Sequence, residues 1–506
     1  MTKDISPPAT PPTYSPIPYR FELERKPVDD HQLLLQSFLL LSPIQKKYFL
    51  HELVDSCDNS QLTFLNSLIA PRLKVDFIKE LPPEIALHIL SFVDLPSDLL
   101  HAISVSKYWH SLIRDDNRLW KLLCKKYDYL VDVGDDSHIC YRDLFKRRYS
   151  IACAWNQGGK VTTVDNGFSQ GLVTSLQFDE KFIVVGCDNH RIEVFSTSTG
   201  KKIRTLEGHE GGVWALQFKG GEKEDPERVL LSGGCDRDVR VWDLNQGKLR
   251  YILRGHTSTV RCLKIRDKRI AVTGSRDTTL RVWDIKRGVL LHVLTGHQAS
   301  VRCVDIYDNF VISGSYDSTA RIWDLETGQC KHTLIGHISQ IYTIVTNGNI
   351  IATGSMDAHI RIWSLETGEC LSTLHGHTSL VGQLQLSGTT LVSGGADGCL
   401  RVWNMNTFEC THQFSAHDNS ITCLQFDEDH ILSAANDGKV KLWDIKQGRL
   451  VRNFTQPSKI VWKIQFNKTK AVILMQRSRS NDSIEEGKTV MEIHDFDLSP
   501  FPIQDL

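Results

Sequence analysis

Proline is nearly missing from most of this 506-residue chain. Sixteen prolines occur, six of them within the first 18 residues, and Pro226 is the only one between Pro96 and Pro457. Proline cannot donate a hydrogen bond to a β-ladder, so a long proline-poor region rich in Val, Ile, Thr and Trp predicts strands. The clustered prolines of residues 1–28 instead predict a disordered tail.

Three further absences narrow the class of protein. No apolar run reaches the ~18–20 residues of a membrane span, and the first residues lack the apolar core of a signal peptide. The net charge is −1, which disfavours a partner such as nucleic acid that is held by bulk charge. The 13 cysteines contain no C-x-x-C pair, so we expect reduced thiols, no metal and a nuclear or cytoplasmic location.

Catalytic motifs are absent as well. The chain has no G-x-S-x-G, no H-E-x-x-H and no P-loop, and no cysteine stands beside a matched His and Asn. We therefore expect a binding protein that is not an enzyme and that uses no cofactor.

Residues 30–75 place apolar side chains at spacings of three and four, which predicts helices, and Ser42-Pro43 is typical of a helix start. The segment is too small to bury its own Leu and Phe side chains. It should pack either on a second copy of itself or on the next domain of the same chain.

Residues 76–125 again show helical periodicity. Here the chain resembles the F-box at the family's own spacing, with Val-Ser-Lys where the family usually has Val-Cys-Lys. The matching residues are Leu81-Pro82-x-Glu84, Ile89-Leu90, Asp94-Leu95, Val105-Ser106-Lys107-x-Trp109 and Leu119-Trp120. The resemblance implies a domain that binds the Skp adaptor of SCF ubiquitin ligases. The expected contact residues are Leu81, Pro82, Ile85, Leu95 and Trp109.

From about residue 170 the chain repeats every 40–47 residues. An apolar residue opens each of eight units, at Val173, Val213, Val260, Val301, Ile341, Val381, Ile421 and Val461. Gly-His and Trp-Asp pairs recur at this period, which is typical of WD repeats with four strands per propeller blade. The last unit has little room for a fourth strand, so we expect a strand from about 151–165 to complete it and close the ring.

A second periodic set has a structural explanation. An Asp precedes each Trp by six residues, and a Ser or Thr lies on the preceding strand, as in Asp317 and Ser313 of the unit that ends at Trp323. We expect His, Asp, Ser or Thr and Trp to form one buried network per blade. Six near-copies of one buried structural network are a better interpretation of these residues than six catalytic triads.

Two positions near one mouth of the ring vary between units, so the fold does not dictate them. They hold arginine at Arg261, Arg276 and Arg302, with Arg237 nearby. Guanidinium groups gathered in a chain of net charge −1 indicate an anionic ligand, and their fork suits phosphate. The alternative is that carboxylates on the same face neutralise them. The neighbours expected around them are Trp214, Ser258, Thr259, Tyr316 and Tyr342.

Together these segments resemble the F-box/WD-repeat substrate receptors of SCF ligases, over about 450 residues, and the eight-bladed subgroup that reads phosphothreonine-proline degrons in particular. The resemblance implies that Arg261, Arg276 and Arg302 contact a phosphate with Arg237 near it. It also implies that Trp214 and Thr259 line a proline pocket and that Tyr316 bonds the peptide. Residues 30–75 resemble that subgroup's dimerisation domain, which implies a homodimer.

The expected architecture is mainly β with an α-helical N-terminal part. It comprises a tail (1–28), a dimerisation segment (30–75), an F-box (76–125), a linker with a possible ring-closing strand (126–165) and an eight-bladed propeller (166–506). The expected function is the binding of Ser/Thr-Pro phosphodegrons for ubiquitination and proteasomal degradation. The alternative is a WD-repeat scaffold of another multiprotein complex.

Overall fold

In a computed structural model of the chain, the structure describes residues 28–73, 75–130, 139–165, 168, 171–221, 227–477 and 487–497. The chain divides into two compact units, Met1–Leu119 and Trp120–Leu506. The predicted tail up to residue 27 lies outside the described residues. No described helix has the length and apolar character needed to cross a membrane.

The first three helices are α1 (Val28–Leu40), α2 (Pro43–Asp55) and α3 (Asn59–Leu73). A capping box starts α2: the Ser42 hydroxyl accepts from the backbone of Gln45, and the Gln45 side chain accepts from the backbone of Ser42. Helix α2 contains no buried residue, and large apolar side chains of all three helices are exposed, among them Leu34, Tyr48 and Phe64. The segment thus forms the predicted helices without covering their apolar side chains.

Five short helices follow: α4 (Phe77–Glu80), α5 (Pro83–Leu90), α6 (Pro96–Ile103), α7 (Lys107–Asp115) and α8 (Asn117–Lys126). Prolines at the first turns of α5 and α6 lack the N–H that a helix start leaves unpaired. The side chains that form this unit's core are fully or almost fully buried: Ile78, Ala86, Leu90, Leu99 and Ile113.

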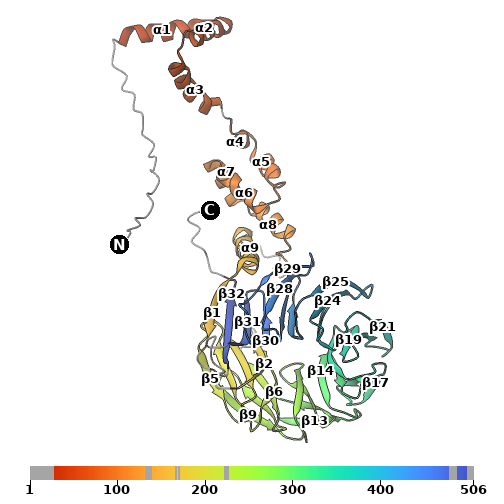
Figure 1. The fold of residues 1–506 in the computed structure, drawn as a ribbon. Helices are drawn as coiled ribbons and strands as arrows, with labels where there is room; N and C mark the ends of the chain where they lie inside the picture. The colour runs from red at the N-terminus through yellow and green to blue at the C-terminus, as the bar shows by residue number, and fades with distance from the viewer. Residues whose placement is uncertain are drawn as a thin grey trace, which may run out of the picture. The chain divides into compact units, whose positions relative to one another are not determined.

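Thirty-two described strands make eight four-stranded antiparallel sheets, arranged around a ring (Figure 1). The first four sheets in chain order are β2–β5 (Val173–Phe178, Phe182–Cys187, Ile192–Ser196, Lys202–Leu206), β6–β9 (Val213–Gly220, Arg228–Gly234, Val239–Asp243, Lys248–Leu253), β10–β13 (Val260–Ile265, Ile270–Ser275, Leu280–Asp284, Val289–Leu294) and β14–β17 (Val301–Tyr307, Phe310–Ser315, Ala320–Asp324, Cys330–Leu334). The next three are β18–β21 (Ile341–Thr346, Ile350–Ser355, Ile360–Ser364, Cys370–Leu374), β22–β25 (Val381–Ser387, Thr390–Gly395, Cys399–Asn404, Glu409–Ser415) and β26–β29 (Ile421–Phe426, His430–Ala435, Val440–Asp444, Arg449–Asn453).

The core of the propeller lies between neighbouring sheets. One cluster joins Leu231 and Val241 of the second sheet to Ala271 and Trp283 of the third, and equivalent clusters recur around the ring. Each blade therefore buries its apolar face only against its neighbours, which is why the ring has to be complete.

The eighth sheet joins distant parts of the chain. Its order is β1 (Lys160–Val164), β32 (Lys488–Asp495), β31 (Lys470–Arg477) and β30 (Ile460–Phe466), with Lys160 opposite Asp495. The ring-closing strand is thus shorter than the 151–165 predicted from sequence. Residues 151–157 belong to helix α9 (Tyr141–Gln157), which ends at Gly158.

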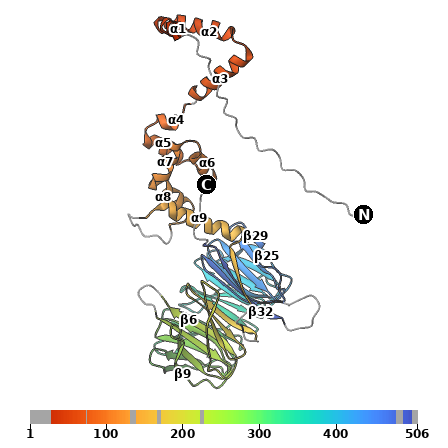
Figure 2. The ribbon, with the colours of Figure 1, turned by 90° about the vertical axis from the view of Figure 1, so that its left-hand side faces the viewer.

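Helix α9 lies beside the last sheets in both ribbon views (Figures 1 and 2). Its Trp155 stacks on Phe496 at 4.0 Å between ring centroids, and its indole N–H donates to the carbonyl of Lys468. The segment that the sequence suggested as a linker over 126–165 therefore contributes a helix and a strand to the propeller unit.

Candidate functional site

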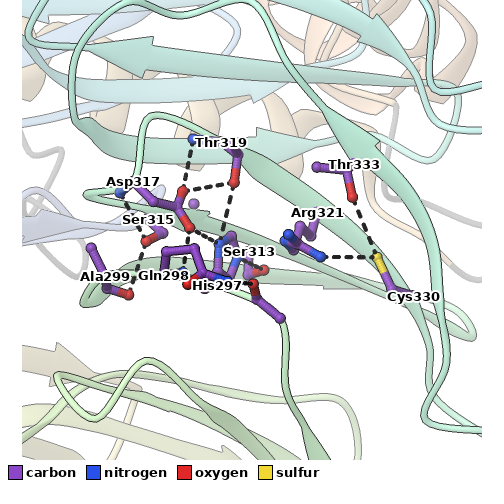
Figure 3. A network of polar contacts seen from close by, with 12 residues as sticks. His297, Gln298, Ala299, Ser313, Ser315, Asp317, Thr319, Arg321, Cys330 and Thr333 are labelled. Carbon is purple, nitrogen blue, oxygen red and sulfur yellow. Dashed lines mark hydrogen bonds and ion pairs between the residues drawn. The ribbon is translucent and has the colours of Figure 1, made fainter.

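The His, Asp, Ser or Thr and Trp network predicted from the repeat is present in six blades. In the blade of Figure 3, His297 Nδ1 lies 2.8 Å from the Asp317 carboxylate and His297 Nε2 lies 2.8 Å from Ser313 Oγ. Trp323 Nε1 donates to the same hydroxyl at 2.8 Å. The other five histidines in this role are His209, His256, His337, His377 and His417.

One proton arrangement satisfies every member of this network. With the proton on Nδ1, the imidazole donates to Asp317, its Nε2 accepts from Ser313, and the Ser313 oxygen accepts from Trp323. Burial would raise the pKa of the Asp317 carboxyl, but hydrogen bonds from His297, Thr319 and the backbone hold it well below its usual range. The network is therefore structural, and we call this set of His, Asp, Ser or Thr and Trp the staple of its blade. Its histidine has no free lone pair for catalysis.

The arginine two residues before each Trp belongs to the same scaffold. A Cβ placed on Gly296 of the Gly-His pair would lie 2.6 Å from Nη1 of Arg321, so the guanidinium packs closely against this glycine. The seventh blade shows the converse: Ala416 replaces the glycine, and Lys441 replaces the arginine and donates to the Ala416 carbonyl at 2.6 Å. These arginines are therefore structural.

The variable residues of the innermost strands share a feature that the sequence did not reveal. In every one of the eight sheets the pairing of the first two strands shifts at this residue, for example between Val260 and Cys262, where Arg261 stands. The eight bulge residues are Thr174, Trp214, Arg261, Arg302, Tyr342, Gly382, Thr422 and Trp462. A bulge leaves one residue out of the ladder and re-aims its side chain, so the fold leaves this position free for binding.

The second variable position is tied to the bulge by a backbone hydrogen bond. Arg276 donates its backbone N–H to the carbonyl of Thr259 at 2.9 Å, and Tyr316 donates to Ser300 at 3.0 Å. The carbonyls of Ser258 and Ala299 also accept hydroxyl bonds, from Ser275 and Ser315. The same bond recurs in the first seven blades, each of which thus presents one bulge residue and one pre-turn residue together.

Five of the predicted residues make direct contacts across blades. The guanidinium carbon of Arg261 lies 4.3 Å above the Trp214 ring, and that of Arg302 lies 5.8 Å from the Tyr342 ring. The rings of Tyr316 and Tyr342 are 5.3 Å apart. Trp214 donates its indole N–H to Cys235 Sγ at 3.0 Å, a contact that sequence reasoning missed although Cys235 occupies a variable position. We call Arg261, Arg276, Arg302, Trp214, Tyr316 and Tyr342 the arginine-aromatic patch.

The patch is positively charged and has no internal counter-ion. Burial, together with the charges of Arg302 and Arg276, lowers the pKa of Arg261. Among the described residues, no carboxylate lies within 4.0 Å of Arg261, Arg276 or Arg302, whereas other arginines, such as Arg250 and Arg269, have such partners. The alternative that carboxylates neutralise these three arginines is therefore wrong.

The remaining predicted residues are less directly connected. Arg237 is exposed and has a positive φ of 70° in the turn after Asp236, and no described contact joins its side chain to the patch. Ser258 and Thr259 precede the bulge and contribute their backbone carbonyls as described above, and both are half-buried. The structure therefore brings Arg261, Arg276 and Arg302 together, whereas the side chain of Arg237 has no described contact with them.

A second candidate surface lies on the helical unit. Pro82, Ile85 and Leu95 are exposed and Leu81 is half-buried, as a contact surface requires. Trp109 is half-buried; its indole N–H donates to Asp76 at 2.6 Å, and its ring packs edge-on against Phe77. Its described contacts are internal to the helical unit.

Sequence reasoning missed one large exposed side chain of this unit. Phe92 follows the end of α5 and is 71% exposed, and Ile89 on the preceding turn is also exposed. Phe92 falls outside the helical periodicity that marks the core, and this mismatch was the available signal. Elsewhere in the described part of the chain, no three His, Cys, Asp or Glu side chains gather as a metal ion would require.

Two protein families match parts of this chain. Residues 78–126 match "F-box-like". Six segments match "WD domain, G-beta repeat": residues 200–243, 247–284, 288–324, 328–364, 368–404 and 408–444. The structure adds a blade on either side of these six.

Three curated proteins are similar to parts of the chain. Cell division control protein 4 of Saccharomyces cerevisiae is 33% identical over 43% of this chain, and F-box/WD repeat-containing protein 7 of Drosophila melanogaster is 38% identical over 38%. A probable E3 ubiquitin ligase complex SCF subunit sconB of Arthroderma otae is 26% identical over 35%. The aligned parts span 29%, 15% and 32% of these relatives. With an F-box-like domain followed by WD repeats in an eight-bladed propeller, the chain belongs to the F-box/WD-repeat family.

Proposed function

We propose that this chain is the substrate-recognition subunit of an SCF-type ubiquitin ligase, in the nucleus or the cytoplasm. Its F-box would bind a Skp-type adaptor, and its arginine-aromatic patch would bind phosphorylated Ser/Thr-Pro segments. The observation that carries the proposal is the group of Arg261, Arg276 and Arg302 without a carboxylate partner among the described residues. One relative's name places it in an SCF complex, which supports the assignment.

The chemistry of the patch supports a phosphorylated ligand. A phosphate brings about two negative charges and three acceptor oxygens, which match several guanidinium groups at once. Partial burial of Arg261 makes its interaction with an anion stronger than at an open surface. The rings of Trp214, Tyr316 and Tyr342 offer apolar surface on which a proline ring after the phosphate can pack.

The role in the ligase is positional. The chain would hold a substrate near a ubiquitin-loaded enzyme and so raise the effective concentration of target lysines. The exposed Ile85, Leu95 and Phe92 provide the apolar surface that an adaptor would cover. Co-purification of the full chain with a Skp-type adaptor, lost in Leu95→Asp, tests this part.

A binding assay tests the arginine-aromatic patch. The full chain should bind a phosphothreonine-proline peptide at least tenfold more tightly than its unphosphorylated form, because hydrogen bonds to charged groups are each worth about 1.5–3 kcal/mol. Arg261→Ala should remove this difference and leave the weak unphosphorylated background unchanged. Arg449→Ala, an exposed arginine of β29, is the matched control and should retain binding. Equal affinity for both peptide forms before mutation refutes the proposal and favours a WD scaffold.

We further propose that residues 30–75 form a homodimer through their exposed apolar side chains. Leu34, Tyr48 and Phe64 together present more apolar surface than a soluble monomer usually leaves open. Light scattering on the full chain should give twice the monomer mass, and the double variant Leu34→Glu/Tyr48→Glu should give the monomer mass. A monomeric wild-type chain contradicts this proposal.

A further inference from the structure

The third blade has an apolar outer edge. Strand β13 is the outermost strand of its sheet, with β12 on one side and no described strand on the other. Its sequence is VLLHVL, in which Val289, Leu290, Leu291 and Val293 are all exposed, the last two by 40% and 41%. The equivalent strands of the next two blades, CKHTL and CLSTL, are one residue shorter, whereas β9 of the preceding blade, KLRYIL, has the same length and exposes Leu249, Tyr251 and Ile252. A long apolar edge is normally avoided because it pairs with other chains.

The apolar side chains of β13 are only partly covered by the propeller. His292 packs against the turn of that blade, where a Cβ placed on Gly328 would lie 3.0 Å from the imidazole. Val293 follows His292 and so faces the opposite side of the strand. The register of β12 and β13 shifts between Val282 and Trp283, so Leu291 stands opposite no residue of β12. Leu291 and Val293 are 40% and 41% exposed, so the propeller's own packing covers them only in part.

The stretch of chain that contains this edge is basic. Residues 248–294 carry twelve lysines and arginines against three acidic residues, in a chain of net charge −1. Several of these cations are paired, but Lys286 and Arg287, in the turn that leads into β13, are exposed and have no carboxylate within 4.0 Å among the described residues. The same turn of the next two blades carries Glu326 and Glu366. The fold thus does not require the basic pair.

We propose that the free edge of β13 binds an extended acidic segment of a partner protein. The segment adds as a fifth, antiparallel strand, with apolar residues against Leu291 and Val293. Because an antiparallel strand ends beside the start of β13, acidic residues at its C-terminal end meet Lys286 and Arg287. Strand addition uses the unpaired backbone groups of the edge for affinity and the side-chain positions for specificity.

The chemistry of the edge favours a polypeptide over a nucleic acid. Single-stranded nucleic acids bind where aromatic side chains stack on bases inside a basic groove. Strand β13 presents aliphatic side chains, and its one ring, His292, is packed on the neighbouring turn. The combination of apolar edge and flanking cations is complementary to an amphipathic acidic strand.

The test uses the full chain and a fluorescent peptide of three Thr-Val repeats followed by three glutamates. We expect binding at low salt that weakens as salt is added, and at least tenfold weaker binding by Leu291→Glu and by the double variant Lys286→Glu/Arg287→Glu. Leu371→Glu is the matched control, because Leu371 occupies the same position on β21 and is 47% exposed. It should bind within twofold of wild type.

Three results would overturn the proposal: unchanged binding by Leu291→Glu, equal binding of a peptide with the glutamates at its N-terminal end, or self-association of the chain that depends on Leu291. An RNA oligomer that binds with Lys286 dependence but without Leu291 dependence would also overturn it. Leu291→Glu should leave the unfolding temperature and phosphopeptide binding unchanged, which separates this edge from the arginine-aromatic patch.

Discussion

At the scale of single residues, arginine serves two opposite purposes in this propeller. Arg321 is part of the scaffold, with its guanidinium 5.9 Å from the Trp323 ring and Nη1 3.8 Å from Cys330 Sγ. Arg261 lies among like charges, and its lowered pKa shows that its environment disfavours the charged form. Arg321 stabilises the fold, whereas Arg261 is repelled by neighbouring arginines, and a bound anion would offset that repulsion.

This difference predicts opposite effects on stability. Arg261→Ala should leave the unfolding temperature unchanged or raise it, because it removes repulsion without breaking an ion pair. Arg321→Ala should lower stability by about 1–2 kcal/mol, because it removes packing around a buried Trp. Thermal unfolding of both variants of the full chain measures this. A loss with Arg261→Ala as large as that with Arg321→Ala would contradict the distinction.

Residue-level predictability followed the same division. The variation between blades at Arg261, Arg276 and Arg302 indicated positions that the fold leaves free, and the structure places them together without counter-ions. The bulge that frees the first position depends on backbone register, which no residue type encodes. The Trp109–Asp76 bond was missed because the two residues lie 33 positions apart on different helices.

At the scale of the element, the staple explains why a Ser or Thr recurs on the second strand of most blades. Ser313 Oγ serves two buried partners, His297 and Trp323. The first blade has no such staple: it carries Asn189 and Phe195 at the Asp and Trp positions and is held by apolar contacts such as Phe168 against Phe195. Apolar contacts can therefore replace the whole staple of a blade, but loss of a single member would leave its polar partners unpaired.

Ser313→Ala should consequently destabilise the chain by about 2–4 kcal/mol, because it leaves two buried polar groups without a partner. Thr333→Ala, at an exposed position on β17 of the same sheet, should change stability by less than about 0.5 kcal/mol. Urea unfolding compares the two. Equal effects of both changes would show that the staple contributes no more than a surface hydroxyl.

Strand and helix boundaries were predictable where the repeat fixed them and unreliable outside it. The apolar run from Ile151 to Trp155 fits a buried strand or a helix equally well, and it forms the end of α9. The informative signal was Gly158, which has a φ of 118° immediately after the helix. Tertiary packing of Trp155 against Phe496 favours the helix over the strand, and the periodicity of the sequence does not reveal this contact.

At the scale of the whole molecule, the repeated staples make stability depend on pH. Burial lowers the pKa of His337 and of His417 in the folded protein. Burial would raise the pKa of Asp397, but hydrogen bonds from His377 and the backbone of Thr378 lower it to about 2. In each case the unfolded chain binds protons at a higher pH than the folded chain, so stability falls as pH falls.

We expect two stages of loss. The histidine contribution is complete above about pH 7 and declines as pH falls below about 6.5, the value for an unfolded histidine. The aspartate contribution declines as pH falls from about 4 toward 2, with Asp397 alone accounting for about 2 kcal/mol. Thermal unfolding of the full chain between pH 8 and pH 3 tests this. A constant unfolding temperature between pH 7.5 and pH 5.5 would contradict the first stage.

The strand that closes the ring has a consequence for how the protein is made. Strand β1 leaves the ribosome roughly 330 residues before its partner β32. At about 5–20 residues per second, translation of that stretch takes on the order of 15–65 s. Throughout this interval β1 has no partner strand, and the eighth sheet that closes the ring cannot form. Completion of the propeller therefore follows release of the last strands, and until then β1 is an unpaired edge that can associate with the wrong strand.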